Sequence, residues 1–349
     1  MGTVTAIAAL LEYFWHPVCT RAEMEAVAPH PLAVTLLGRD LAIADVATAN
    51  FGGTVMAAVD RCPHRSTRLS VGWIETGSIR CAYHGWRYST AGECVEIPAT
   101  PDGPLPVGPC LETFEVAVAY DLVWVRLDGS ARTTIPANPA WDDTSMRVLM
   151  GAPYTWPTSA LRRVENFVDL AHFAWVHDGS LGRRDEPVPP IPAVTRADGE
   201  LRFHYDPPPM QPEREALYGH SRYRMPMPCT VDIEFHTDSG ARRRLWMTAS
   251  PLDERTCRAF WFVSRDDDLD GDDAPYLAFQ QVILDEDESV VCNQDPPELV
   301  LEPGFELSVR TDRVSIEYRR WLRELVDVAS DGPAALQRVL SASSLSSPV

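Results

Sequence analysis

The first 127 residues alternate between apolar and polar positions in short runs, a pattern typical of β-strands rather than helices. Three such runs, at residues 33–37, 41–46 and 54–59, are bounded by turn-forming residues. Two more runs, at residues 114–119 and 122–127, are separated by only two residues, which predicts a hairpin. The pattern therefore predicts a small all-β domain at the start of the chain.

The second part of the chain combines helical spacing with further alternation. Residues 193–263 alternate, with Asp198-Gly199 and Ser239-Gly240 as turn signals, and this predicts an antiparallel sheet. Three stretches carry apolar residues at helical spacing and are predicted to be helices: residues 158–177, 275–291 and 312–328.

A polar, proline-containing stretch at residues 129–139 separates the two patterns and predicts a linker. We therefore expect an all-β domain in residues 1–128 and a domain of helices around an antiparallel sheet in residues 129–349, an α+β chain overall. A length of 349 residues suits two hydrophobic cores better than one.

Charge and composition limit the partners of the chain. The formal net charge is −19, whereas nucleic-acid binding requires concentrated Lys and Arg, so we expect no nucleic-acid partner. No run approaches the roughly 18 apolar residues of a membrane span, and the N-terminus lacks the basic segment of a secretory signal. The eight cysteines lack the dense spacing of a disulfide framework. These features predict a cytoplasmic protein without membrane association, in which some cysteines are metal ligands.

Two pairs of Cys and His lie on separate segments of the predicted β domain. Cys62 and His64 form the first pair, and Cys81 and His84 form the second. Two thiolates and two imidazoles are the ligand set of a Rieske [2Fe-2S] cluster, which relays single electrons. A Cys₂His₂ zinc site uses the same ligand types, but zinc fingers pair Cys with Cys and His with His. Because each segment here offers one of each, we expect the cluster and keep zinc as the alternative.

The sequence around these four residues resembles the Rieske ring-hydroxylating oxygenase α-subunit family. The similarity is carried by DRCPHR at 60–65, CAYHGW at 81–86, WHPV at 15–18 and GECVEIPA at 92–99. Two positions depart from the family: Ala82 stands where Pro is usual, and Asp121 stands where a Gly usually precedes the last strand. Asp tolerates left-handed backbone better than most residues, so the hairpin can survive. The resemblance implies a catalytic domain of helix-grip type after the Rieske domain.

His172 and His177 form a further pair inside the predicted helix of residues 158–177. Five positions on an ideal helix correspond to a rotation of about 140°, so both side chains can reach one metal only if the helix ends or distorts near them. Asp178-Gly179 supplies such an ending. Two histidines and one carboxylate form the facial triad of Fe(II) oxygenases, which leaves coordination positions open. The pair therefore predicts a mononuclear iron site whose carboxylate lies elsewhere.

The resemblance implies where that carboxylate lies and what Asp169 does. In the family the carboxylate belongs to a Glu-Asp pair on a downstream helix, and Glu286-Asp287 fits this pattern. We expect Asp287 to be the ligand, with Asp285 as its nearest rival, although four consecutive acidic residues also occur on solvated helix faces. Asp169 is similar to the aspartate that links a Rieske histidine of one subunit to an iron-binding histidine of its neighbour. This implies a homotrimer.

Together these sites predict the terminal component of an oxygenase. A separate NAD(P)H-dependent reductase or ferredoxin is expected to reduce the cluster, because the chain has no nucleotide- or flavin-binding motif. With O₂ as co-substrate, the mononuclear iron would then hydroxylate, demethylate or dihydroxylate a small organic substrate. The length and residues 312–320 most resemble compact demethylases and monooxygenases. The alternative from another class is a Rieske electron-transfer protein whose second domain binds a partner without catalysis.

Overall fold

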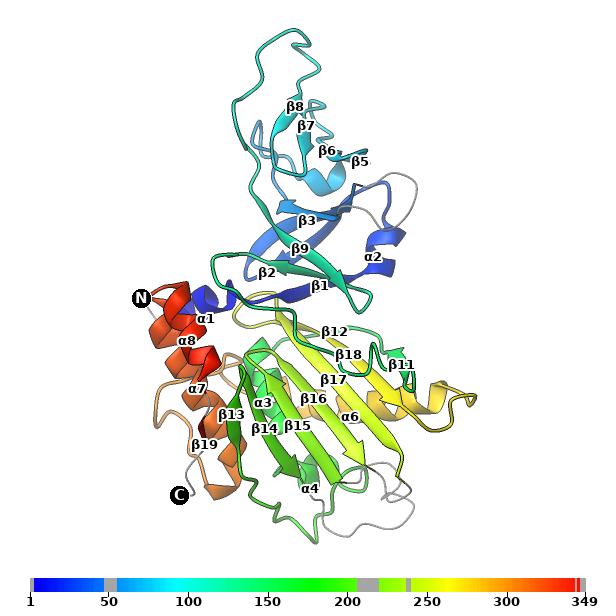
Figure 1. The fold of residues 1–349 in the computed structure, drawn as a ribbon, viewed down its shortest axis with the longest axis vertical. Helices are drawn as coiled ribbons and strands as arrows, with labels where there is room; N and C mark the ends of the chain where they lie inside the picture. Colours follow the sequence, from blue (N-terminus) through cyan, green and yellow to red (C-terminus); the bar gives the residue numbers. More distant parts are fainter. Residues whose placement is uncertain (1–2, 47–54, 206–219, 237–239, 343, 346–349) are drawn as a thin grey trace. The chain divides into compact units, whose positions relative to one another are not determined.

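The computed structural model describes residues 3–46, 55–205, 220–236, 240–342 and 344–345 (Figure 1). Its contacts divide the chain into two compact units. Glu12–Ile135 form the first, here called the β unit, and Met1–Leu11 with Pro136–Val349 form the second, here called the mixed unit.

The division between the units falls at residues 135 and 136, whereas the sequence predicted it at 128 and 129. The reason is that Arg126 Nη1 donates hydrogen bonds to the carbonyls of Ala131 and Thr133, at 2.8 and 3.1 Å, which ties the start of the predicted linker to the β unit. The N-terminal helix α1 (Thr3–Leu11) contacts helix α7 (Arg313–Ala329), so the first residues belong to the mixed unit.

The β unit contains two antiparallel sheets. The larger has the strand order β1-β10-β9-β4-β3-β2: β1 (His16–Thr20), β2 (Leu32–Leu36), β3 (Arg39–Asp45), β4 (Val55–Val59), β9 (Thr113–Ala119) and β10 (Leu122–Arg126). The smaller has the order β5-β6-β7-β8: β5 (Trp73–Glu75), β6 (Ser78–Arg80), β7 (Arg87–Ser89) and β8 (Cys94–Glu96). Helix α2 (Arg21–Ala26) and the 3₁₀ turn η1 (Leu69–Val71) complete the unit.

The five strands predicted in this region are confirmed as β2, β3, β4, β9 and β10; Thr54, the predicted first residue of β4, lies outside the described residues. The strands β5 to β8 were not predicted, because three-residue strands are too short to show alternation. The hairpin between β9 and β10 is closed by Tyr120 and Asp121, both at positive φ (59° and 56°). This is the conformation of a type I′ turn, so Asp121 does replace the usual Gly.

Strand β3 separates two cores in the β unit, because its successive side chains point to opposite faces. Leu41 and Ile43 pack in one core with residues of β1 and β10. The small side chains Ala42 and Ala44 face the other core, which contains Cys62. The short alanine side chains leave room on this face for the segments that carry the predicted cluster ligands.

The mixed unit is built on an antiparallel sheet with the order β11-β18-β17-β16-β15-β14-β13-β19, and β12 pairs with β18. Its strands are β11 (Arg147–Met150), β12 (Tyr154–Trp156), β13 (Thr195–Ala197), β14 (Glu200–Tyr205), β15 (His220–Pro226), β16 (Thr230–His236), β17 (Arg242–Pro251), β18 (Cys257–Arg265) and β19 (Ser344–Leu345). The sheet predicted for residues 193–263 is confirmed. The turn predicted at Asp198-Gly199 joins β13 to β14, whereas Ser239 of the second predicted turn lies outside the described residues.

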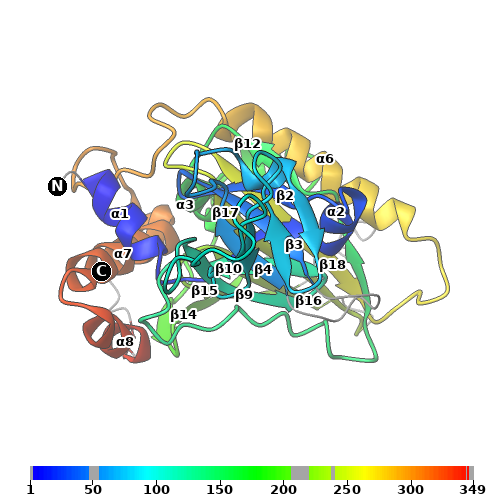
Figure 2. The same ribbon diagram turned by 90° about the horizontal axis from the view of Figure 1, so that it is seen from above.

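Two groups of helices pack in the mixed unit. Helices α3 (Ala160–Val168), α4 (Phe173–Val176) and α6 (Ala274–Val291) lie against one face of the sheet (Figure 1). Helices α1, α7 and α8 (Pro333–Ser341) lie beside one another (Figure 2), and the 3₁₀ turn η2 (Arg310–Asp312) leads into α7. Helix α7 buries Val314, Tyr318, Trp321, Leu322 and Leu325, the residues whose spacing predicted it. None of the described helices combines the length and apolar character that a membrane span needs.

Candidate functional site

The four residues predicted to hold a cluster lie on two loops of the β unit. Cys62 and His64 follow β4, and Cys81 and His84 connect β6 with β7. Burial and the neighbouring thiol of Cys62 raise the pKa of Cys81, and the ring centres of His64 and His84 are 4.6 Å apart. Like side chains therefore lie together, as required by a cluster in which one iron takes two thiolates and the other takes two imidazoles.

The two loops have the same backbone geometry. In the first, the Cys62 carbonyl accepts a hydrogen bond from the Ser66 N–H at 2.9 Å, and in the second the Cys81 carbonyl accepts one from the Gly85 N–H at 3.1 Å. Ser66 and Gly85 both have positive φ, at 59° and 72°. Each loop thus turns back after its histidine, and this directs a cysteine and a histidine to the same side.

The surroundings of the four side chains fit a Rieske cluster. Both cysteines are buried, whereas His84 is exposed. Nδ1 of His64 is buried without a hydrogen-bond partner among the described residues, a costly state for a ring nitrogen unless it binds a metal. Partial desolvation, together with His84 and Arg65, lowers the pKa of His64 and favours the neutral ring that coordinates metals.

Tyr88 on β7 is the residue that approaches the candidate thiolates from the core. Its side chain is fully buried, and its hydroxyl oxygen lies 3.1 Å from Sγ of Cys62. Burial and the neighbouring Cys62 raise the pKa of Tyr88, so the hydroxyl keeps its proton and can donate to the sulfur. Hydrogen bonds to sulfur are one of the means by which a protein sets the potential of a cluster.

The helix predicted over residues 158–177 is interrupted before the first candidate iron ligand and ends at the second. Helix α3 ends at Val168, and Asp169 takes an extended conformation (φ −81°, ψ 111°). Oδ1 of Asp169 accepts a hydrogen bond from the Ala171 N–H at 2.9 Å, a local bond that competes with helix continuation. His172 and His177 then flank the short helix α4. The helix end that their five-residue spacing required is confirmed, because α4 ends at Val176 and His177 takes a non-helical conformation (φ −105°, ψ 34°).

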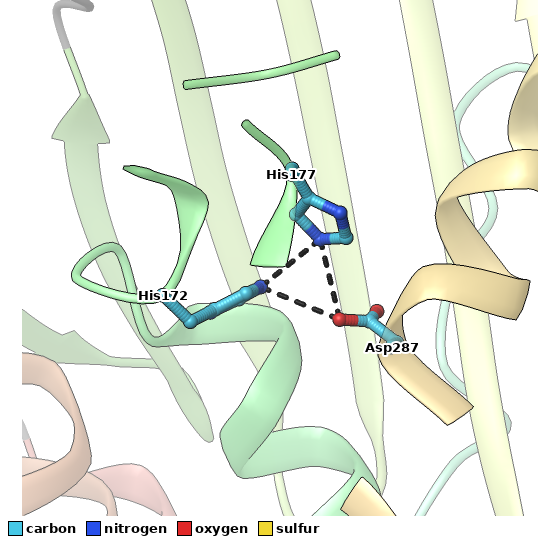
Figure 3. A group of neighbouring side chains, drawn as sticks. All are labelled: His172, His177 and Asp287. Carbon is cyan, nitrogen blue, oxygen red and sulfur yellow. Dashed lines mark hydrogen bonds and ion pairs between the residues drawn. The ribbon is translucent and has the colours of Figure 1, made fainter. Parts of the chain in front are cut away.

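His172, His177 and Asp287 meet in the mixed unit (Figure 3). The two Nε2 atoms are 3.2 Å apart, and Oδ1 of Asp287 lies 3.2 Å from Nε2 of His177 and 3.5 Å from Nε2 of His172. Ligand bonds of about 2.1 Å that meet at right angles place ligand atoms about 3 Å apart. The three atoms therefore fit one face of an octahedron, the arrangement of the Fe(II) facial triad.

Helix α6 directs Asp287 toward the two histidines, whereas Asp285 and Glu286 point in other directions. Asp285, the rival candidate, is exposed and accepts a hydrogen bond from the Gln281 amide at 2.7 Å. Glu286, to which the sequence assigned no role, accepts the Nδ1–H of His177 at 2.7 Å. This bond leaves Nε2 of His177 with its lone pair directed at the site. The adjacency of Glu286 to Asp287 was visible in the sequence, but the histidine that it meets was not.

Opposing effects set the charge of the triad. Burial opposes ionisation of Asp287, but hydrogen bonds from His172 and His177, together with the charge of Arg163, outweigh it and hold the pKa of that carboxyl well below its usual range. Burial alone would lower the pKa of His177, yet Asp287 and Glu286 raise it. The site thus contains an ionised carboxylate that stabilises a positive charge placed between the three side chains.

Asp169 lies next to the triad without bonding to it. Its Oδ2 is 3.8 Å from Nδ1 of His172, beyond hydrogen-bond distance, and its side chain is 37% exposed. Nδ1 of His172 is buried and has no hydrogen-bond partner in the part of the chain that the structure describes. Both groups are therefore available for a further interaction.

A small chamber of about 50 Å³ opens beside the triad. Its walls are mostly apolar and aromatic: Phe167, Phe173, Tyr223, Ile233 and Ile283 contribute to them, with the triad on one side. A larger cavity of about 510 Å³ shares Phe235, Leu245 and Gln280 with the chamber. A space large enough for a small molecule therefore adjoins the chamber beside the triad.

Known proteins match both parts of the chain. Residues 14–115 match the Rieske [2Fe-2S] domain, and residues 156–328 match the vanillate O-demethylase oxygenase C-terminal domain. The methylxanthine N3-demethylase NdmB of Pseudomonas putida is 40% identical over 338 residues, which cover 94% of this chain and 93% of that protein. The chain belongs to the Rieske non-haem iron oxygenases.

Further members of this family agree along the whole length. The methylxanthine N1-demethylase NdmA of Pseudomonas putida is 38% identical, over 95% of this chain and 93% of the relative. The solved structure of NdmA with caffeine has a TM-score of 0.90 at 36% identity and covers 98% of each chain. Dicamba monooxygenase bound to dicamba, at 21% identity and a TM-score of 0.75, shares the fold.

As a Rieske oxygenase, the chain is a terminal oxygenase component. Its cofactors are a [2Fe-2S] cluster and a mononuclear iron, with O₂ as co-substrate, and it works with a separate reductase or ferredoxin on small molecules. The predicted Rieske and antiparallel-sheet domains are confirmed. The zinc alternative does not hold, because residues 14–115 match a [2Fe-2S] domain. The alternative of an electron carrier with a non-catalytic second domain does not hold either, because residues 156–328 match an oxygenase domain.

The contact between Tyr88 and Cys62 yields a test of the cluster environment. We expect Tyr88→Phe to lower the midpoint potential of the cluster by about 40 mV, because the lost hydrogen bond, worth about 1 kcal/mol, favours the more negative reduced state. A redox titration monitored by visible absorption measures the shift. Tyr120→Phe, the same substitution in the hairpin of the larger sheet, should leave the potential unchanged; an equal shift in both variants would contradict the assignment.

Proposed function

We propose that this chain is the oxygenase component of an oxidative N-demethylase whose substrate is a small N-methylated heteroaromatic compound of the methylxanthine type. The observation that carries the proposal is the similarity to NdmB, 40% identity over nearly the whole of both chains. Cys62 and Cys81 would bind one iron of the cluster, and His64 and His84 the other. The triad of His172, His177 and Asp287 would bind the mononuclear iron.

When bound, the cluster supplies single electrons and the mononuclear iron activates O₂. The overall reaction consumes one O₂, two electrons and two protons. One oxygen atom enters a C–H bond of the N-methyl group and the other leaves as water. The N-hydroxymethyl product then loses formaldehyde, which breaks the C–N bond and returns a proton to the nitrogen.

The chamber supports a flat aromatic substrate. Phe167 and Phe173 offer aromatic surface beside the triad, and such walls also exclude water from the reacting carbon. Gln280, on α6, is only 3% exposed, and no hydrogen bond joins its side-chain amide to another described residue. An amide that lines a cavity and bonds to no other described residue is well suited to a ring nitrogen or carbonyl group of a heteroaromatic ligand. Gln280 would therefore orient the ring so that one methyl group faces the triad.

Two adjoining cavities support a route for the substrate to this position. The inner chamber of about 50 Å³ accommodates the reacting end of a ligand, whereas the cavity of about 510 Å³ lies within the usual size of small-molecule sites. Phe235, Leu245 and Gln280 line both spaces. In this proposal the substrate enters through the larger cavity and passes these residues to the iron.

Asp169 would connect the iron to the cluster of a second copy of the chain. It lines a cavity of about 250 Å³ that also contains His172 and the exposed side chain of Leu307. In the β unit, Tyr83 and His84 are exposed and their ring centres lie 3.8 Å apart, so they offer an imidazole beside an apolar ring. A carboxylate that accepts N–H bonds from imidazoles of two subunits fixes both rings. We include in the proposal the homotrimer implied by the sequence. We also include the cytoplasmic location, because none of the eight cysteines, all of them among the described residues, forms a disulfide.

The reaction itself is tested by product analysis. With a surrogate reductase and N-methylated heteroaromatic substrates, we expect one formaldehyde for each O₂ consumed. His172→Ala should keep the visible spectrum of the cluster and lose turnover, because the two sites use separate ligands. Turnover by His172→Ala would refute the iron site. Formaldehyde from O-methylated but not N-methylated aromatics would refute the substrate class.

Gln280 has a matched neighbour, Gln281, on a different face of α6. We expect Gln280→Leu to raise KM about tenfold with unchanged iron content, because the substrate loses one hydrogen bond in a buried site. Gln281→Leu is the control, since Gln281 is exposed and bonds to Asp285 instead of lining the chamber. Steady-state kinetics of both variants measure the difference, and equal KM values would remove Gln280 from the substrate site.

The role of Asp169 is tested by replacing its carboxylate with the side-chain amide of asparagine. We expect Asp169→Asn to keep the cluster and the iron but to slow reoxidation of the cluster in a single turnover by about 10- to 100-fold, as for other groups that position metal-bound histidines. Asp285→Asn, at an exposed acidic residue, provides the control. If stopped-flow traces of Asp169→Asn match those of the unmodified protein, the bridge is wrong.

A further inference from the structure

Arg163 is a fully buried cation close to the proposed iron site. It lies on α3 with no exposed side-chain surface. Its guanidinium carbon is 4.1, 4.6 and 5.7 Å from the ring centres of Phe167, Trp156 and Tyr154. The carboxylate within ion-pair distance is Asp287, whose Oδ2 is 3.5 Å from Nη1. An aromatic cage thus holds a permanent positive charge next to a candidate iron ligand.

The two oxygen atoms of Asp287 have different surroundings. Oδ1 faces Nε2 of both histidines of the triad and accepts a hydrogen bond from the Asn166 amide at 3.2 Å. Oδ2 faces Arg163. Arg163 also donates to the side-chain oxygen of Asn166 through Nη1, and to the Tyr154 hydroxyl through Nε at 2.7 Å. One guanidinium therefore fixes the orientation of Asp287 both directly and through Asn166.

Folding stability alone gives no reason for a charge at this position. Replacing a buried ion pair with apolar residues of similar volume is often neutral or stabilising, because the charges no longer have to be removed from water. In addition, Nη2 of Arg163 is buried without a hydrogen-bond partner among the described residues. The cage would accept an apolar side chain, so the contact with Asp287 is what an arginine adds.

We propose that Arg163 is a positioning residue that restricts Asp287 to binding the iron through Oδ1 alone. A carboxylate that binds through one oxygen occupies one coordination position, whereas one that binds through both occupies two. With two histidines, the first arrangement leaves three of the six positions of an octahedral iron for O₂, water or substrate. The inference rests on the proposed iron site and is independent of the proposed substrate.

The test measures iron binding rather than turnover. The full chain with its cluster intact is depleted of mononuclear iron and titrated anaerobically with Fe(II) against a chelator of known affinity. We expect Arg163→Met, which keeps the apolar part of the side chain, to weaken Fe(II) binding by about 10- to 100-fold. Crystal structures of the iron-loaded proteins should show one Asp287 oxygen at the iron in the unmodified protein and both in Arg163→Met.

Arg162 provides the matched control. It precedes Arg163 on the same helix and is equally buried, with 2% side-chain exposure, but it bonds to Glu306 at 2.6 Å and to the carbonyl of Glu298. Arg162→Met therefore removes a buried guanidinium of α3 without touching Asp287. We expect it to lower the melting temperature while Fe(II) affinity and Oδ1 coordination stay unchanged.

A second pair of variants covers the case in which Arg163→Met does not fold. Arg163→Lys keeps the charge, but one ammonium group cannot reach Tyr154, Asn166 and Asp287 together, so we expect about tenfold weaker Fe(II) binding. Arg162→Lys should bind Fe(II) as the unmodified protein does.

Three results would count against the proposal. Oδ1-only coordination in Arg163→Met at any Fe(II) affinity, or unchanged Fe(II) affinity in Arg163→Lys if the Met variant is not folded, would overturn it. Equal weakening in the Arg162 and Arg163 variants would assign Arg163 to packing alone. Failure of the unmodified protein to bind Fe(II) at the triad would instead overturn the proposed iron site, a distinguishable outcome.

Discussion

Two imidazole nitrogens and one carboxylate oxygen converge to within 3.2–3.5 Å in the mixed unit. The arrangement of the surrounding elements is what keeps these three atoms together. Three electron-rich atoms at this distance repel one another unless a proton or a cation lies between them. The chain maintains the approach by placing the ligands on separate, rigid elements. His172 and His177 flank a four-residue helix, and Asp287 lies about one turn before the end of an eighteen-residue helix.

The end of helix α4 makes this convergence possible. A continuous helix would direct His172 and His177 about 140° apart. Because α4 ends at Val176 and His177 leaves the helical conformation (φ −105°, ψ 34°), its ring can turn toward that of His172. Asp169, which ends α3 and bonds to the Ala171 N–H, is in the proposed function also the group that links the iron to a neighbouring cluster.

The two metal sites differ in their exposure, and the difference agrees with their chemistry. The candidate cluster ligand His84 is exposed on the β unit, where it is accessible to an electron donor or acceptor. His177 and Asp287 are nearly fully buried, and the chamber beside them has aromatic walls. Electron exchange requires close approach to the surface, whereas oxygen activation requires that water be kept from the reacting carbon. A single chain provides both environments by using two units with separate cores.

The sequence alone determined what depends on local spacing. Short windows of the sequence showed the Cys and His pairs, the required helix end near His172 and His177, five of the six strands of the larger β sheet and the stripe on α7, because strand and helix periods are local properties. Family resemblance added Asp287 and Asp169. Only the tertiary structure decided which member of the acidic run 285–288 turns toward the histidines, since neighbouring residues on a helix point about 100° apart and the buried side depends on packing. The same holds for Glu286, Arg163 and Gln280: their partners lie on other elements or in a cavity, and no local pattern specifies such contacts.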